Sequence, residues 1–317
     1  MNYKKQQIRN HFINFNKEIA ISPSINNLFL DIREQVIEYF KANKISFWKH
    51  DTLDDIKDNH TPSGVSISSQ VSCLNHLYPL RYDKAAVLTI AQVICPEIED
   101  VMQIETDKFF PAFISFEVVS DNDHLNEKSK SRGSYCTSVD ALIYGKHKDG
   151  RNILIPIEWK YTEKYHENED LSIEDRVKGD GGKKGEERLR RYPKLIDSSR
   201  QLKALKEMKE YKSSVYFFEP FYQLMRQTLW AEQMCINKDR ETIKADDFIH
   251  AHIIPEENTD LLDHKYLVSD NGMEKTWTNY LKNQDKYKII SPEKLLSNID
   301  KQKYSDLIQY LSLRYWK

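Results

Sequence analysis

Three residues near the middle of the chain have the types and spacing of a hydrolytic metal site. Asp140 lies in one apolar segment, and Glu158 and Lys160 lie in the next. Strand residues alternate between two faces, so Glu158 and Lys160 share one face and Trp159 points to the other. A hairpin turning at Asp149-Gly150 would bring Asp140 opposite the neighbourhood of Trp159. Two carboxylates and one ammonium would then converge, and such a set can hold a divalent metal ion and polarise a water molecule.

The elements that must position these residues are expected to be helices and strands in an α/β order. Helical spacing predicts helices over residues 25–39, 83–95 and 221–236, with a serine of Ser68-Ser69 as a candidate N-cap and Ser291-Pro292-Glu293 as a helix start for the last segment. β-Rich alternation predicts strands over residues 113–119, 139–144, 153–161, 215–218 and 248–254. Residues 170–195 are expected to form a long loop, followed by a helix over 198–210. This order predicts a mixed central sheet flanked by helices.

Composition narrows the class of protein. The chain has 317 residues, of which 30 % are charged and 39 % hydrophobic, with a formal net charge of −2. No apolar run approaches the roughly 18 residues that span a membrane, and the N-terminal residues lack an apolar signal region. Its four cysteines, at 73, 95, 136 and 235, are expected to be reduced thiols. These features predict a cytoplasmic protein, and the absence of a Walker loop or GxGxxG predicts no nucleotide cofactor.

Asp140 followed by Glu158-x-Lys160 after a short hairpin resembles the PD-(D/E)XK nuclease superfamily, and within it the branch of bacterial restriction endonucleases. The stretches that carry the resemblance are residues 68–70, 132–140, 158–163, 220–234 and 310–316. One departure is Val139, which stands where the superfamily's first motif is named for a proline. The resemblance implies a restriction-endonuclease-like core over residues 65–317 that ends in a helical segment. Residues 1–64, including a polar linker at 51–64, are expected to form a helical N-terminal extension.

The resemblance also implies roles for individual residues. Asp140, Glu158 and the main-chain carbonyl of Trp159 would bind Mg²⁺, with Mn²⁺ able to substitute. Apart from the resemblance, Glu117 ends the expected first strand and could reach the same site as a further ligand. Lys160 would orient or deprotonate the attacking water and stabilise charge on the phosphate. The implied activity is an endonuclease that hydrolyses DNA by direct water attack, in restriction or phage defence. Because restriction enzymes commonly dimerise, a homodimer is a candidate assembly.

Two further features are candidates for contacting DNA. Residues 176–194 hold eight basic and three acidic residues, a formal charge of +5, and the candidate contacts there are Lys178, Lys183, Lys184, Arg188, Arg190 and Arg191. Glycines let a backbone approach a phosphate closely, and cations supply affinity through counterion release. On the 221–236 helix an apolar stripe is expected to face the core, and the other face carries Gln223, Arg226 and Gln227 as candidate substrate contacts.

Alternative interpretations stay open at each point. Lys160 and its carboxylates could form a surface salt bridge, Glu117 could be an edge carboxylate, and the basic stretch and polar helix face could simply be solvated. Two rival functions also remain. One is a DNA-binding protein built on an inactive nuclease fold. The other is a different carboxylate enzyme such as a glycosidase, which would need neither Lys160 nor the basic stretch.

Overall fold

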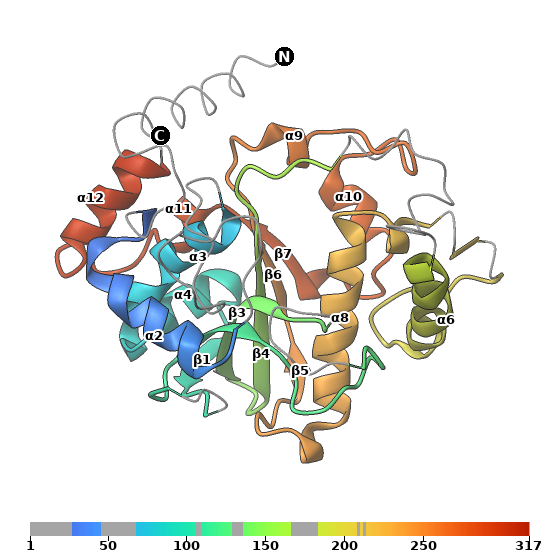
Figure 1. The fold of residues 1–317 in the computed structure, drawn as a ribbon, viewed down its shortest axis with the longest axis horizontal. Helices are drawn as coiled ribbons and strands as arrows, with labels where there is room; N and C mark the ends of the chain where they lie inside the picture. The colour runs from blue at the N-terminus through green and yellow to red at the C-terminus, as the bar shows by residue number, and fades with distance from the viewer. Residues whose placement is uncertain are drawn as a thin grey trace.

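The computed structural model of the chain describes residues 27–45, 68–105, 109–128, 136–165, 183–207, 210–211 and 214–316. In these residues one mixed β-sheet carries helices on both of its faces (Figure 1). This confirms the predicted α/β class, and the arrangement is consistent with a restriction-endonuclease-like fold. No helix in the described ranges is both long enough and apolar enough to cross a membrane.

The sheet is built around the β3–β4 hairpin. Its strands are β1 (Ile98–Met102), β2 (Ile114–Val118), β3 (Val139–His147), β4 (Asn152–Trp159), β5 (Asp247–Phe248), β6 (His250–Ile253) and β7 (Tyr287–Ile290). The strand order is β1-β3-β4-β6-β7, with β2 also pairing with β3 and β5 also pairing with β4. β3 is antiparallel to β1, β2 and β4, whereas β5 and β6 run parallel to β4 and β7 runs parallel to β6. The hairpin turn contains Gly150 at φ +90°, a left-handed conformation that glycine adopts at little cost.

Helices cover the two faces of the sheet as separate layers (Figure 1). The first layer contains α2 (Arg33–Ala42), α3 (Ser69–Leu77), α4 (Lys84–Ile94), α11 (Pro292–Leu295) and α12 (Ser305–Arg314). The second contains α6 (Lys183–Ser198), α8 (Phe221–Ile236), α9 (Thr259–Leu262) and α10 (Met273–Thr278). Short 3₁₀ segments connect them: η2 (Leu30–Ile32), η3 (Tyr78–Leu80), η5 (Val215–Phe217), η6 (Lys238–Arg240) and η7 (Gln284–Lys286).

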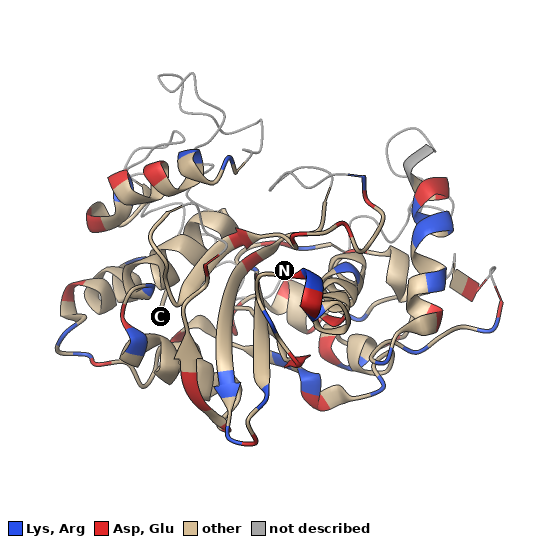
Figure 2. Ribbon diagram, turned by 90° about the horizontal axis from the view of Figure 1, so that it is seen from below, with Lys and Arg blue, Asp and Glu red and all other residues tan. Residues whose placement is uncertain are grey.

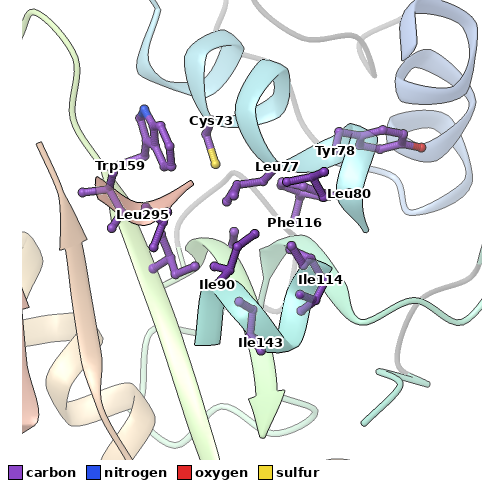
Figure 3. Packing of buried hydrophobic residues seen from close by; sticks show 14 of the residues in the cluster. Cys73, Leu77, Tyr78, Leu80, Ile90, Ile114, Phe116, Ile143, Trp159 and Leu295 are labelled. Carbon is purple, nitrogen blue, oxygen red and sulfur yellow. The ribbon is translucent and has the colours of Figure 1, made fainter. Parts of the chain in front are cut away.

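Each layer encloses its own hydrophobic core against the sheet, and β4 contributes to both. Ile155, Ile157 and Trp159 belong to the core of the first layer, whereas Leu154 belongs to that of the second. Figure 3 shows Trp159 within the first core, together with Cys73 of α3 and Leu295 of α11. All residues of β4 after the first are buried, as expected for a strand between two helical layers.

The predicted helices have a side-chain cap, a buried apolar stripe, or both. Asp83 caps α4 by accepting hydrogen bonds from the main-chain N–H groups of Ala85 and Ala86. The side chain of Ser68 likewise accepts from Val71 N and caps α3, and an N-cap serine was predicted in this stretch. α8 buries its predicted stripe completely, and its residues with less than 3 % exposure include Phe221, Leu224, Met225, Thr228 and Leu229.

Four predictions about local structure are wrong. Within the expected loop 170–195, the described part forms α6, because its apolar side chains Tyr192 and Ile196 are buried in the second core despite Pro193. Residues 199–207 form no helix; Leu202 instead makes a β-bridge to Leu281.

The expected strand over 215–218 is the 3₁₀ segment η5, closed by the hydrogen bond from Phe218 N to Val215 O. β1 lies before the segment expected to be the first strand, and neither β1 nor β7 was predicted.

The described residues of the expected N-terminal extension pack into the same core as the sheet. Val36, Tyr39 and Phe40 of α2 are fully buried in the first core, and Tyr39 Oη donates to Phe116 O of β2 at 3.0 Å. The expected linker at 51–64 lies outside the described residues. The division of the chain at residue 64 therefore stays a prediction.

Candidate active site

Three carboxylates lie on three adjacent strands. β2 and β3 pair Phe116 with Ala141 and Val118 with Val139, so Glu117 lies across from Asp140 between two registered pairs. β3 and β4 pair Ala141 with Ile157, and continuing this register by one residue places Asp140 beside Glu158. Like charges on neighbouring strands repel. Figure 2 shows acidic positions at the ends of the central strands that lie away from the β3–β4 turn.

Asp140 lies between the other two acidic side chains. Its Oδ2 atom accepts a hydrogen bond from the main-chain N–H of Trp159 at 2.7 Å. Burial, followed by repulsion from Glu158 and Glu117, raises the pKa of Asp140 well above its ordinary value, although Lys160 and the Trp159 N–H act in the opposite direction. The site thus gathers negative charge on one half-buried and two buried carboxylates.

Glu158 and Lys160 form a buried ion pair under α8. Their exposed fractions are 1 % and 4 %, and Lys160 Nζ donates to Glu158 Oε1 and, at 2.6 Å, to Gln223 Oε1. Burial by itself lowers the pKa of Lys160, but Glu158 and other neighbours outweigh it and raise that pKa well above its ordinary value. The other carboxylate oxygen of Glu158 accepts from Gln227 Nε2, which also donates to Ser138 O at 3.2 Å. The surface salt bridge considered above is therefore not what the structure shows.

Gln223 and Gln227 lie at this centre rather than on an open helix face. They are one turn apart on α8 and hold Lys160 and Glu158 respectively. Gln227 is 1 % exposed, and its Oε1 atom has no hydrogen-bond partner among the described residues. The structure brings these two predicted substrate contacts to the charged residues themselves.

Glu117 reaches the site through an unusual backbone conformation. Its φ is +49°, in the left-handed region that a non-glycine residue seldom adopts, at a cost of about 1–3 kcal/mol. Its side chain is 7 % exposed and accepts hydrogen bonds from Gln70 Nε2 at 2.7 Å and Ser138 Oγ at 3.3 Å. Such strain is retained where surrounding structure enforces it, and it occurs at functional sites more often than elsewhere.

The donor set fits a hard divalent cation. Mg²⁺ takes oxygen ligands, usually one or two carboxylates with water and substrate phosphate. Asp140 and Glu158 supply carboxylate oxygens, and Trp159 supplies a carbonyl oxygen next to them in the chain. Among the described residues these three acidic side chains face one ammonium, that of Lys160, so an added positive charge would offset their repulsion. Among the described residues, His, Cys, Asp and Glu side chains form no group of three or more that could hold a metal ion by themselves.

Five of the six predicted basic contacts lie in α6. Lys178 lies outside the described residues, and Lys183 and Lys184 begin the helix. The guanidinium of Arg188 lies 4.5 Å from the ring centre of Tyr222 on α8, and the exposed Arg190 donates weakly to Glu186 O. Arg191 forms an ion pair with Glu187 one turn earlier. In Figure 2 basic and acidic positions are interspersed along α6.

Arg226 lies in a separate buried cluster. Its Nε atom is 3.2 Å from Glu127 Oε1 and 3.1 Å from Thr137 Oγ1. Glu127 is 8 % exposed and also accepts from Tyr192 Oη at 2.7 Å and from Thr137. This carboxylate joins α6, α8 and the residues before β3, so the structure gives Arg226 a packing role in the free protein.

Sequence reasoning missed several neighbours of the charged residues. Gln70 was noted only as part of a resembling stretch, and it is 47 residues from its partner Glu117. Ser138 contacts both Glu117 and Gln227, and Tyr165 lies with its ring centre 5.6 Å from Lys160 Nζ. Ser138 and Tyr165 lie near the ends of the predicted strands, and this position could have identified them as neighbours of the site. No local pattern identifies Gln70.

Comparison with known proteins gives one match. The model of a protein family described as "Restriction Endonuclease associating with ARP" matches residues 2–316. No curated protein matches the chain, and no solved structure matches it. A restriction endonuclease family implies nuclease activity with DNA as the substrate, which favours a nuclease over the glycosidase alternative. The match covers nearly the whole chain, and the protein therefore belongs to this restriction endonuclease family.

Proposed function

We propose that the protein is a Mg²⁺-dependent endodeoxyribonuclease with its hydrolytic centre at Asp140, Glu158 and Lys160. The observation that carries the proposal is the row of carboxylates on β2, β3 and β4, of which Glu117 and Glu158 are buried and Asp140 is half-buried, with one lysine ion-paired to Glu158. A stable protein seldom buries like charges together without a functional reason, because each unpaired charge costs free energy. Membership of the PD-(D/E)XK superfamily and a role in restriction or phage defence are part of this proposal.

The roles follow from the contacts of each residue. Asp140, Glu158 and the Trp159 carbonyl would hold the ion, with Glu117 as a further ligand, and Mn²⁺ would substitute for Mg²⁺. The bound ion would supply Lewis-acid polarisation of a phosphate oxygen. Lys160 places a positive charge beside the same carboxylates, where it stabilises negative charge that develops on the phosphate.

The remaining candidate residues would hold the centre or the substrate. Gln227 fixes Glu158, and Gln223 fixes Lys160. The basic residues of α6 and the stretch before it, together with Arg226, are the proposed DNA contacts, and they would act mainly on phosphates without reading sequence. A homodimer would place two centres on one duplex and so allow both strands to be cut.

Cleavage of supercoiled plasmid and phage DNA tests the proposal. The purified protein is incubated with Mg²⁺, Mn²⁺ or EDTA beside Lys160→Ala. Lys148→Ala is the matched control, because Lys148 lies in the β3–β4 turn with more than half of its side chain exposed. We expect metal-dependent fragments from wild type and Lys148→Ala, and none from Lys160→Ala. Binding of DNA without cleavage in either metal would overturn the proposal in favour of a binding protein.

A further inference from the structure

A chain of hydrogen bonds links the segment after α12 to the candidate active site. Trp316 Nε1 lies 3.0 Å from His76 Nε2, and His76 Nδ1 lies 2.7 Å from the main-chain oxygen of Ser72. The Ser72 hydroxyl in turn accepts from Trp159 Nε1 at 3.0 Å. The main-chain N–H of Trp159 then donates to Asp140 Oδ2 at 2.7 Å. Four hydrogen bonds thus connect Trp316 to Asp140, although these residues are far apart in the sequence.

The directions of these bonds are determined by their chemistry. A carbonyl oxygen only accepts, so His76 Nδ1 carries the proton and donates to Ser72 O. His76 Nε2 is then the unprotonated nitrogen, and it accepts from the indole N–H of Trp316. Burial lowers the pKa of His76 to about 3, so the ring is neutral at physiological pH. One tautomer therefore satisfies both neighbours at once.

Ring contacts reinforce the same chain. The His76 ring centre lies 4.9 Å from that of Trp159 and 5.9 Å from that of Trp316. His76 and Trp159 have 0 % of their surface exposed. The Trp159 indole is therefore fixed on the α3 side of β4 by contacts and by its hydrogen bond to Ser72, whereas its backbone lies at the carboxylates.

We propose that Trp316 and His76 are positioning residues for the nuclease centre, acting through Ser72 and Trp159 on Asp140. The inference rests on the proposed function, because it concerns the geometry of the same centre. Trp159 contributes to that centre only through its main chain, so the orientation of its indole sets where the Asp140 carboxylate is held. A displacement of about 1 Å at a reacting centre can cost about 10²-fold in rate.

A second set of contacts, which does not involve the Trp316 indole, also holds α12 in place. Asn75 Nδ2 of α3 donates to Tyr310 Oη at 3.1 Å and to Tyr315 Oη at 2.7 Å. Arg314 also donates to Tyr310 Oη at 2.8 Å. Because these bonds hold α12 against α3, removing the Trp316 indole N–H changes the positioning chain without releasing the helix.

Trp316→Phe tests the inference, because phenylalanine keeps an aromatic ring and lacks the N–H donor. Tyr310→Phe is the matched control: it removes a partly buried hydroxyl from α12, just before Trp316, but lies outside the chain to Trp159. For each variant we would measure the single-turnover cleavage rate at saturating Mg²⁺, the DNA dissociation constant in Ca²⁺, and the unfolding temperature. We expect the rate of Trp316→Phe to fall about tenfold or more with unchanged DNA affinity, and Tyr310→Phe to cleave like wild type.

Any result other than the two expected ones overturns the inference. Wild-type cleavage by Trp316→Phe overturns it and leaves the proposed function standing, provided that Lys160→Ala is inactive. Equal rate losses in Trp316→Phe and Tyr310→Phe would show a general loosening of α12. If Trp316→Phe does not fold, Ser72→Ala interrupts the same chain from the other end, and a wild-type rate there overturns the inference. A wild-type protein that cleaves no DNA overturns the proposed function and this inference together.

Discussion

Replacing Lys160 by methionine should cost the protein both stability and activity, and a second substitution should separate the two effects. Methionine keeps an unbranched apolar side chain in the site but removes the charge. Lys160 and Glu158 are 4 % and 1 % exposed, so the variant leaves a buried carboxylate without its ammonium partner. Breaking a buried pair in this way costs about 3–5 kcal/mol. We therefore expect the free energy of unfolding to fall by about that amount at pH 7 in EDTA.

The double variant Lys160→Met with Glu158→Gln removes both charges. Replacing a whole buried pair by neutral groups is often close to neutral for stability, and a glutamine oxygen at 158 can still accept from Gln227. The double variant should therefore recover most of the lost unfolding free energy and still cleave no DNA. The assay is denaturant unfolding in EDTA, followed by plasmid cleavage in Mg²⁺.

An exposed ion pair provides the control. Lys148 and Glu97 are each more than half exposed, so Lys148→Met should change stability by less than about 1 kcal/mol and keep full cleavage. The reasoning is refuted if Lys160→Met unfolds within about 1 kcal/mol of wild type, because the pair would then be effectively hydrated. Cleavage by Lys160→Met at the wild-type rate would refute the role of Lys160 itself.

Three further predictions concern other parts of the molecule. Gln227→Leu should lower the single-turnover rate at least about tenfold without weakening DNA binding. The variant removes a charge-assisted hydrogen bond to Glu158 that is worth about 1.5–3 kcal/mol. An unchanged rate would rule out this role of Gln227. Arg226→Ala should lower the unfolding temperature, because it leaves Glu127 without its cation, and should also weaken DNA binding. Arg190→Ala should weaken DNA binding and reduce its salt dependence without changing the unfolding temperature, and a lowered unfolding temperature in that variant would contradict this. Burial, followed by Glu257 and Glu256, raises the pKa of Glu293 to about 7. Ionising Glu293 therefore costs stability as pH rises from its unfolded pKa of about 4.3 through about 7. Glu293→Gln should be more stable than wild type above pH 7 and equal to it below about pH 4, and a constant difference across pH would contradict this.

The parts of the fold that the sequence predicted depend on local signals. The β3–β4 hairpin follows from two alternating apolar segments around Asp149-Gly150, and Gly150 has the positive φ that the turn requires. α4 follows from the Asp83 cap and the helical spacing of its apolar residues. The convergence of Asp140 with Glu158 and Lys160 follows from the same hairpin.

The parts that were not predicted depend on contacts between distant segments. Glycines before residue 186 and Pro193 indicate a loop, yet the second core holds Tyr192 and Ile196 in α6, and this packing outweighs the local preference. Leu202 lies in an apolar pattern typical of a helix, but its backbone pairs with Leu281 instead. The contact between Gln70 and Glu117 could not be predicted, because helical and strand spacing relate only residues within the same element.

The end of β4 explains why supporting residues should affect turnover more than binding. Trp159 is held on one side of the sheet by α3 through Ser72, and Glu158 and Lys160 are held on the other by α8 through Gln227 and Gln223. The repulsion between neighbouring carboxylates favours their separation. Their positions therefore depend on both anchors, which are Ser72 of α3 on one side of the sheet and Gln223 and Gln227 of α8 on the other. DNA affinity, in contrast, would come mainly from cations on α6, and the described contacts of Arg188, Arg190 and Arg191 involve neither anchor. Substitutions at the two anchors should therefore lower the rate of cleavage while DNA affinity and its salt dependence stay at wild-type values.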